Sequence, residues 1–210
     1  MTDKERMSSR ELGLLLAQQL LDVEDLHYGL WDAGLEVYPG NVALAQQRYT
    51  AMLLALLERL LADSKQPRLL DVGCGKGYLM FDFTKVVPGI EVYGLDISEY
   101  AINDAKEEIK DRIIHGNATS LPYEDGEFDL VYSLNTLHNL HCFDLDKALR
   151  EMNRVGKEKY LCVESYRNEK EKVNLLYWQV TCEAFNTPEE WDWWFKNCGY
   201  TGDHSFIYFE

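Results

Sequence analysis

The sequence RLLDVGCGKGY occupies residues 68–78 and decides the fold. An apolar run that ends in an acid and then in alternating glycines is typical of a buried parallel strand, followed by a tight turn and a helix. The three glycines carry no side chain that would hold a ligand away from the backbone, and Asp71 places a carboxylate beside them. We therefore predict a ligand-binding turn at the carboxyl end of this strand.

The glycine spacing distinguishes between nucleotide-binding motifs. A dinucleotide fingerprint has the spacing G-x-G-x-x-G, because its third glycine allows close packing of the helix. Here the glycines follow the spacing G-x-G-x-G, and an acid lies two residues ahead of the first. The stretch resembles motif I of the class I S-adenosylmethionine (SAM) dependent methyltransferases, whose pattern is acid-x-G-x-G-x-G. The resemblance implies that the cofactor contacts this turn at Asp71, Gly73, Cys74 and Gly75.

A second acid supports the resemblance. The apolar pattern of residues 90–95 predicts another strand, which ends in Asp96, 19 residues after Gly77. An ionised carboxylate only accepts hydrogen bonds, so Asp96 suits the two hydroxyl groups of a ribose. The family has an acid at this place, which implies cofactor contacts from Asp96 and Ile97. The alternative is that Asp96 merely precedes Ser98 as the cap of the next helix.

The third strand, at residues 113–114, is followed by a loop that departs from the family pattern. Where the family has G-D-A, with an acid near the adenine amino group, this chain has Asn117 and Ala118 after the glycine. The resemblance implies that both contact the adenine, although Asn117 offers only an uncharged oxygen. An ordinary turn is the other explanation of Asn117.

Residues 127–135 resemble the F-D-x-V strand of the family, and open α/β sheets bind ligands at the carboxyl ends of their strands. We expect Asn135 to orient the amino acid moiety of the cofactor, or the substrate. His138 is the candidate catalytic base, because a near-neutral imidazole accepts a proton from a hydroxyl or an amine. If the segment is helical, His141 lies on the same helix face as His138, and it is a candidate substrate contact. For both histidines a hydrogen-bonded structural role is the alternative.

Candidate substrate contacts follow the fifth strand, which is predicted at residues 159–165. Tyr166 and Arg167 lie at its carboxyl end, where a guanidinium suits a carboxylate or phosphate of the substrate. An ion pair with a nearby acid is the alternative for Arg167. Apolar residues at helical spacing predict a helix over 170–185, which would carry Trp178 above the substrate.

Alternating elements complete the predicted α/β fold, a Rossmann-like three-layer sandwich with a mostly parallel sheet. Thr187, Pro188 and Glu190 predict a capping box that begins a helix ended by Gly199. A class I methyltransferase normally has two strands after the fifth. One is predicted at residues 204–209, and the other is absent or supplied by residues 173–180. Further helices are expected at residues 78–86, 98–109 and 145–155.

An N-terminal segment, residues 1–66, is expected to form a helical lid, with residues 67–210 as the cofactor-binding core of a single compact domain. Helices are predicted at residues 9–22 and 42–61. Between them, a stretch that resembles the H-Y-G-x-W segment of small-molecule methyltransferases contains Tyr28 and Trp31. The resemblance implies that both contact the cofactor, through the phenol hydroxyl and through ring attraction to the sulfonium. A hydrophobic plug is the alternative.

Composition limits the partners. The chain has 210 residues, 46% of them hydrophobic, and a formal net charge of -15. An acidic chain is unsuited to nucleic acid, whose binding requires clustered Lys and Arg. Five cysteines without a C-x-x-C motif are typical of free thiols in a reducing cytoplasm, and we expect no metal site. We find no run long enough for a membrane span and no secretion signal, and we expect a monomer or homodimer.

The resemblance implies a SAM-dependent methyltransferase, with S-adenosylhomocysteine (SAH) as by-product. Its acceptor is expected to be a small molecule, with a sugar, polyketide or other metabolite hydroxyl as the first choice. Three alternatives remain: methylation of a small amine, a non-catalytic SAM-binding protein, and a NAD-dependent oxidoreductase. The last would need the third glycine one residue later and a substrate domain.

Overall fold

The computed structural model describes residues 41–60, 66–179 and 181–209. The chain divides into two compact units, Met1–Ala62 and Asp63–Glu210.

The described part of the first unit is one helix, α2 (Val42–Leu60), which confirms the helix predicted over residues 42–61. Its buried hydrophobic residues Ala45, Tyr49 and Leu53 are spaced by four and therefore share one face. The helix predicted at residues 9–22 lies outside the described residues.

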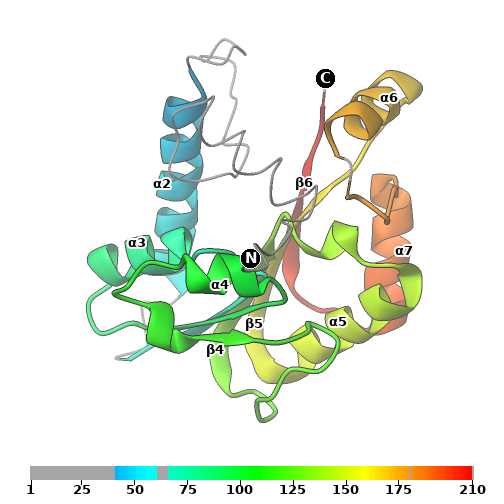
Figure 1. Cartoon of the computed structure of the whole chain (residues 1–210). Coiled ribbons are helices and arrows are strands. Elements are labelled where there is room, and N and C mark those ends of the chain that lie inside the picture. Colours follow the sequence, from blue (N-terminus) through cyan, green and yellow to red (C-terminus); the bar gives the residue numbers. More distant parts are fainter. Residues whose placement is uncertain (1–40, 61–65, 180, 210) are drawn as a thin grey trace, which may run out of the picture. The chain divides into compact units, whose positions relative to one another are not determined.

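The second unit is built on a sheet of six strands. These are β1 (Arg68–Val72), β2 (Glu91–Asp96), β3 (Ile113–His115), β4 (Phe128–Leu134), β5 (Gly156–Glu164) and β6 (Asp203–Ile207). Their order is β3-β2-β1-β4-β5-β6, and all five pairings are parallel (Figure 1). The order reverses where β1 meets β4, and ligands of open α/β sheets bind at the carboxyl edge beside such a point. The predicted Rossmann-like fold with a mostly parallel sheet is confirmed.

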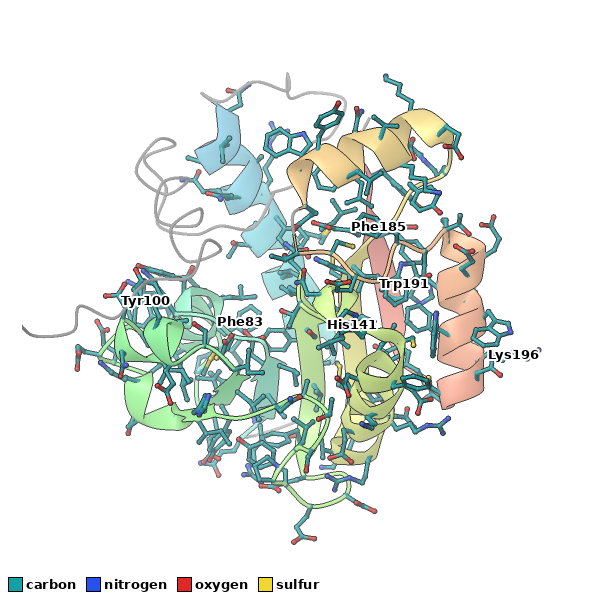
Figure 2. All side chains as sticks on the ribbon, turned by 45° about the vertical axis from the view of Figure 1, so that its right-hand side comes forward. Phe83, Tyr100, His141, Phe185, Trp191 and Lys196 are labelled. Carbon is teal, nitrogen blue, oxygen red and sulfur yellow. The ribbon has the colours of Figure 1, made fainter. Side chains whose placement is uncertain are left out.

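Helices cover both faces of this sheet, which gives three layers. Successive side chains of a strand point to opposite faces. In β4, Val131 belongs to the core cluster that includes Leu149 of α5 (Cys142–Val155), whereas the ring of Tyr132 lies 5.5 Å from that of Phe83 in α3 (Tyr78–Val86). The two helices therefore lie on opposite faces (Figures 1 and 2). The predicted bounds of α3 are confirmed, and α5 begins three residues before its predicted start.

The last helix, α7 (Pro188–Cys198), begins with the predicted capping box. Thr187 accepts the amide hydrogen of Glu190 at 3.3 Å, and the Glu190 carboxylate accepts that of Thr187 at 2.7 Å. Gly199 ends the helix with a φ of 68°. Figure 2 shows that Trp191 points from α7 toward the sheet and Lys196 away from it, so the aromatic face of the helix is core.

The helix predicted over residues 98–109 is wrong in length. Ser98 caps a helix, but that helix, α4, spans only Glu99–Asn103. Lys76 forms an ion pair with Asp104, and the amide of Lys106 donates to the Lys76 carbonyl at 3.2 Å. These contacts draw the chain toward the glycine turn instead of into another helical turn, and the 3-10 helix η2 (Lys110–Arg112) then leads into β3.

The helix predicted over residues 170–185 is also too long. The structure has α6 (Glu169–Trp178), whose N-cap Asn168 accepts the Glu171 amide hydrogen at 3.0 Å. Since residues 173–178 are helical, they supply no strand, and β6 is the one strand after β5 in the part of the chain that the structure describes. None of the described helices is both long and apolar enough to cross a membrane.

Candidate functional site

The turn after β1 is shaped by three glycines with left-handed backbone. Gly73, Gly75 and Gly77 have φ angles of 88°, 55° and 74°. A Cβ atom on Gly73 would overlap the side chain of Thr136, whereas one on Gly75 would meet no heavy atom within 4 Å. The backbone at Gly75 is therefore open to a ligand, and the backbone at Gly73 is packed against the segment after β4.

Asp96 joins this turn to the end of β2. Its Oδ2 accepts the amide hydrogen of Gly75 at 2.7 Å, and its Oδ1 accepts that of Ser98 at 2.8 Å. Each carboxylate oxygen has two lone pairs, so Asp96 retains capacity for further donors. A pair of neighbouring hydroxyl groups is one set of donors that such a carboxylate can accept.

The charge around the turn is negative. Asp71 is buried. The burial of Tyr132, followed by the negative charge of Asp71, holds the pKa of the Tyr132 phenol well above its usual value. Burial, followed by the charges of Asp71 and Asp96, raises the pKa of the Cys74 thiol far above its ordinary value. Two carboxylates beside a neutral thiol favour a ligand that carries positive charge.

Beyond Asp96, the side chain of Ile97 is 63% exposed. An exposed apolar side chain next to hydrogen-bonding groups suits the face of a flat ligand ring. Asn117 is exposed, and its Oδ1 accepts the Thr119 amide hydrogen at 3.0 Å. This is the geometry of an ordinary turn, the other explanation given above for Asn117. Ala118 is buried at 9% exposure.

Asn135, directly after β4, has a strained backbone. It is the one non-glycine residue of the described part with a positive φ, at 54°. Its Oδ1 is buried and has no hydrogen-bond partner among the described residues. A buried polar atom without a partner at the carboxyl end of a strand makes Asn135 a candidate ligand contact.

His138 lies in the 3-10 helix η3 (Leu137–Asn139) and is fully buried beside Glu164, the last residue of β5, which is also fully buried. The His138 Nε2 and Glu164 Oε2 atoms lie 3.4 Å apart, and the Glu164 amide donates to His138 Nδ1 at 3.4 Å. The segment after α6 crosses this place: Glu183 and Ala184 both donate amide hydrogens to the His138 carbonyl at 2.9 Å. His138 is thus part of a packed acid and imidazole pair.

Sequence reasoning missed Glu164. It follows directly on the apolar run of residues 160–163 and belongs to no motif. A signal was nevertheless present, because Asp71 and Asp96 are also acids near the carboxyl ends of apolar strands.

The four candidate substrate contacts come later in the chain than the glycine turn. Three of them contact other side chains of this chain, and the fourth, Tyr166, is buried. His141 is 75% exposed and lies 3.4 Å from Glu183. Arg167 forms three side-chain hydrogen bonds of 2.6 to 3.1 Å with Glu171, which is the ion pair of the alternative explanation. Tyr166 is buried, and the exposed Trp178 stacks on Phe209 with ring centroids 6.3 Å apart.

The structure therefore brings Asp71, Gly73, Cys74, Gly75 and Asp96 together at the ends of β1 and β2. Asn135 joins them through its neighbour Thr136, whose hydroxyl lies 3.4 Å from the Gly73 carbonyl oxygen. Tyr28 and Trp31 lie outside the described residues.

Comparisons with known proteins agree with this geometry. A family model described as a methyltransferase domain matches residues 70–163. The chain is 34% identical over 139 residues to 27-O-demethylrifamycin SV methyltransferase of Amycolatopsis mediterranei, covering 63% of this chain and 47% of that protein. It is 34% identical over 134 residues to demethylmenaquinone methyltransferase of Anoxybacillus flavithermus, covering 60% of this chain and 55% of that protein. The chain thus spans about half the length of these curated relatives.

Solved structures share the fold. The YcgJ protein of Bacillus subtilis superposes with a TM-score of 0.57 at 24% identity, over 70% of this chain and 68% of that one. The [4+2]-cyclase SpnF superposes with a TM-score of 0.63 at 21% identity, over 91% of this chain and 73% of that one. Residues 70–163 thus match a methyltransferase domain, and the sequence motif, the parallel sheet and the curated relatives together support a class I SAM-dependent methyltransferase.

Proposed function

We propose that this domain binds SAM at the ends of β1 and β2 and transfers its methyl group to a hydroxyl of a small molecule. The observation that carries the proposal is the Asp96 carboxylate, which is fixed by the Gly75 and Ser98 amides beside bare backbone. That arrangement suits a ribose diol.

The residues present fit the whole cofactor. Asp96 would accept the ribose hydroxyls, and the exposed Ile97 would lie on the adenine, with Asn117 and Ala118 at its edge. The open backbone at Gly75 and the charge of Asp71 suit the ammonium group of the amino acid moiety and the sulfonium, and Cys74 lies between them in the turn. Asn135 would orient the amino acid moiety or the acceptor. Tyr28 and Trp31 are proposed as further contacts on the resemblance alone.

Bound SAM supplies an electrophilic methyl group with a neutral thioether as leaving group. The protein's own task is to hold the acceptor in line and to exclude water. His138 is proposed as the group that takes up the acceptor proton, a need that is greater for a hydroxyl than for an amine. His141, Tyr166, Arg167 and Trp178 are proposed to shape the acceptor side.

The choice of oxygen is supported by one relative, whose name specifies an O-demethylated substrate. Methylation of a small amine is the first alternative. The second alternative is a non-catalytic domain that binds SAM without methyl transfer. A nicotinamide-dependent oxidoreductase is disfavoured by the glycine spacing.

The organisation of the whole chain belongs to the same proposal. Residues 1–66 would form the lid and residues 67–210 the core, acting as a monomer or homodimer on a small molecule without nucleic acid. All five cysteines are free thiols, which supports a reducing cytoplasm as the location.

The proposal is tested by incubating the protein with SAM and matched pairs of acceptors, each pair differing only in a hydroxyl or an amine. SAH release together with an acceptor that gains one CH2 in mass supports methyl transfer, and the reacting member of the pair identifies the atom. The Asp96→Ala variant is the control, since it should lose the reaction with every acceptor. SAH binding without turnover on any pair would favour the non-catalytic alternative.

A further inference from the structure

A surface pocket of about 440 Å³ lies beside the N-terminal half of α7. It is lined by residues of α7 and of the turn before it, namely Asn186, Glu189, Glu190, Trp193 and Trp194. The volume is in the range of small-molecule sites, and so is the combination of aromatic walls with a few polar groups. None of these residues belongs to the proposed cofactor or acceptor contacts, so the pocket is a second candidate site.

The two tryptophans of the pocket form an aromatic corner. Trp193 is 58% exposed, and Trp194 is partly buried against the hydrophobic core. Their ring centroids lie 5.4 Å apart and their planes meet at 82°, which is an edge-to-face contact. The face of an indole ring carries negative charge density and attracts cations more strongly than that of any other aromatic side chain. Two rings at right angles suit a compact, rounded cation better than a flat ligand ring.

Carboxylates add negative charge to the aromatic corner. Glu189 lies four residues before Trp193 on α7, so the acid and the ring share a helix face, and Glu190 has the same spacing from Trp194. The Glu190 carboxylate accepts the Thr187 amide hydrogen at 2.7 Å and is thereby used in the capping box. Glu189 is exposed and forms no ion pair with a lysine, arginine or histidine of the described residues. Its charge is therefore available to a ligand.

In the part of the chain that the structure describes, no lysine or arginine lies over either ring of the aromatic corner. Such contacts occur elsewhere: Arg167 lies 4.1 Å from the ring centroid of Tyr208, and Lys172 lies 5.1 Å from that of Tyr166. Lys196, near the other end of α7, points away from the sheet (Figure 2). The described residues thus supply aromatic faces and a carboxylate, but no cation to fill the corner.

We propose that the aromatic corner binds a small quaternary ammonium cation. The methyl groups of the cation would contact the rings of Trp193 and Trp194, and the Glu189 carboxylate would face its charge. A primary ammonium is the poorer ligand, because it carries three hydrogen-bond donors and an indole offers no acceptor. The formal net charge of -15 also raises the local concentration of cations at the surface. This site goes beyond the proposed function and does not depend on methyl transfer.

The test is NMR of the indole N–H groups in the full chain, titrated with choline and with its neutral analogue. The analogue carries a tert-butyl group in place of the trimethylammonium group, so it keeps the shape of choline and lacks the charge. The protein has five tryptophans, so the signals of Trp193 and Trp194 are assigned by their loss in Trp193→Phe and Trp194→Phe. We expect both signals to shift saturably with choline, at a dissociation constant in the millimolar range, and to stay unchanged with the analogue.

Trp178 is the internal control, because it is 68% exposed on α6 and does not line the pocket. Its indole signal should stay unchanged with choline. Equal shifts at Trp178, or equal shifts with choline and with the neutral analogue, would overturn the proposal. Tighter binding of ethanolamine than of choline would overturn the choice of a quaternary cation. These titrations use the wild type, so they decide the matter even if a charge variant does not fold.

A charge variant tests the carboxylate. Glu189→Gln should weaken choline binding by about three- to fivefold, since it removes the available negative charge. The matched control is Glu158→Gln, a change of an exposed acid near the amino end of β5, which should leave the affinity within about 1.5-fold of the wild-type value. Equal choline affinity in Glu189→Gln and the wild type would contradict the proposal. Neither SAM nor an acceptor is needed, so a failure of SAH binding would overturn the proposed function and leave this result unchanged.

Discussion

Gly75 donates its amide hydrogen to Oδ2 of Asp96 at 2.7 Å, which joins the glycine turn after β1 to the carboxyl end of β2. The second oxygen of the same carboxylate accepts the Ser98 amide at 2.8 Å. One acid thus orders both turns at the place where the cofactor's ribose is proposed to lie.

Replacement of Asp96 by Asn tests this relationship. The amide nitrogen of Asn would face a backbone donor, so one of the two hydrogen bonds should be lost, at roughly 1–3 kcal/mol of unfolding free energy. We expect SAH affinity to fall by about tenfold or more. Urea unfolding and calorimetry measure the two effects. Glu99→Gln, an exposed change three residues on, is the control, and equal SAH affinity in Asp96→Asn and wild type would contradict the assignment.

Alanine at Gly73 and at Gly75 should have unequal effects on stability. Both glycines have a positive φ, which costs an alanine roughly 1–2 kcal/mol. Only at Gly73 does the added Cβ also overlap Thr136. In urea unfolding, Gly73→Ala should therefore be the less stable of the two variants. A Gly75→Ala variant that is as unstable as Gly73→Ala would show that the space at Gly75 is not open.

The ion pair of Glu171 with Arg167 should contribute stability that depends on pH. Hydrogen bonds from the Arg167 guanidinium hold the pKa of Glu171 below its ordinary value of 4.5. Because the folded-state pKa is the lower one, the contribution is complete above the ordinary value and is lost as the pH falls through the folded-state value. Glu171→Gln should therefore be less stable than the wild type at pH 7, by roughly 1 kcal/mol or more. The difference should narrow in urea titrations at acidic pH, and a difference that is constant with pH would contradict the pairing.

The five thiols should differ widely in reactivity. Cys142 is exposed, whereas Cys162, Cys182 and Cys198 are buried. Burial raises the pKa of Cys182 and Cys198 to about 12, so little thiolate is present at pH 8. Iodoacetamide labelling followed by mass spectrometry should modify Cys142 first. All five thiols should react alike in urea, and rapid labelling of Cys198 in the native protein would contradict its burial.

The elements with local signals were predicted from sequence alone. The capping box of Thr187 and Glu190 and the turn of Gly73 to Gly77 depend on residues within a few positions of each other. The structure reproduces both. The hydrogen bonds and backbone angles that define each of the two elements depend only on residues within that element.

Tertiary contacts explain what sequence reasoning could not supply. Helix α6 ends at Trp178 because Gln179 turns to donate to Glu164, although the apolar spacing continues to residue 185. Helix α4 is short because Lys76 binds Asp104 and the Lys106 amide. Glu164 itself was overlooked for the same reason, since its partners His138 and Gln179 are distant in the chain. Periodicity describes one segment and contains no information on such partners.

The most direct test of the account is calorimetric titration of the protein with SAH and, separately, with NADH. The glycine spacing, the Asp96 carboxylate and the exposed Ile97 predict saturable one-site binding of SAH and no binding of NADH. Tight binding of NADH without binding of SAH would contradict the assignment of the cofactor.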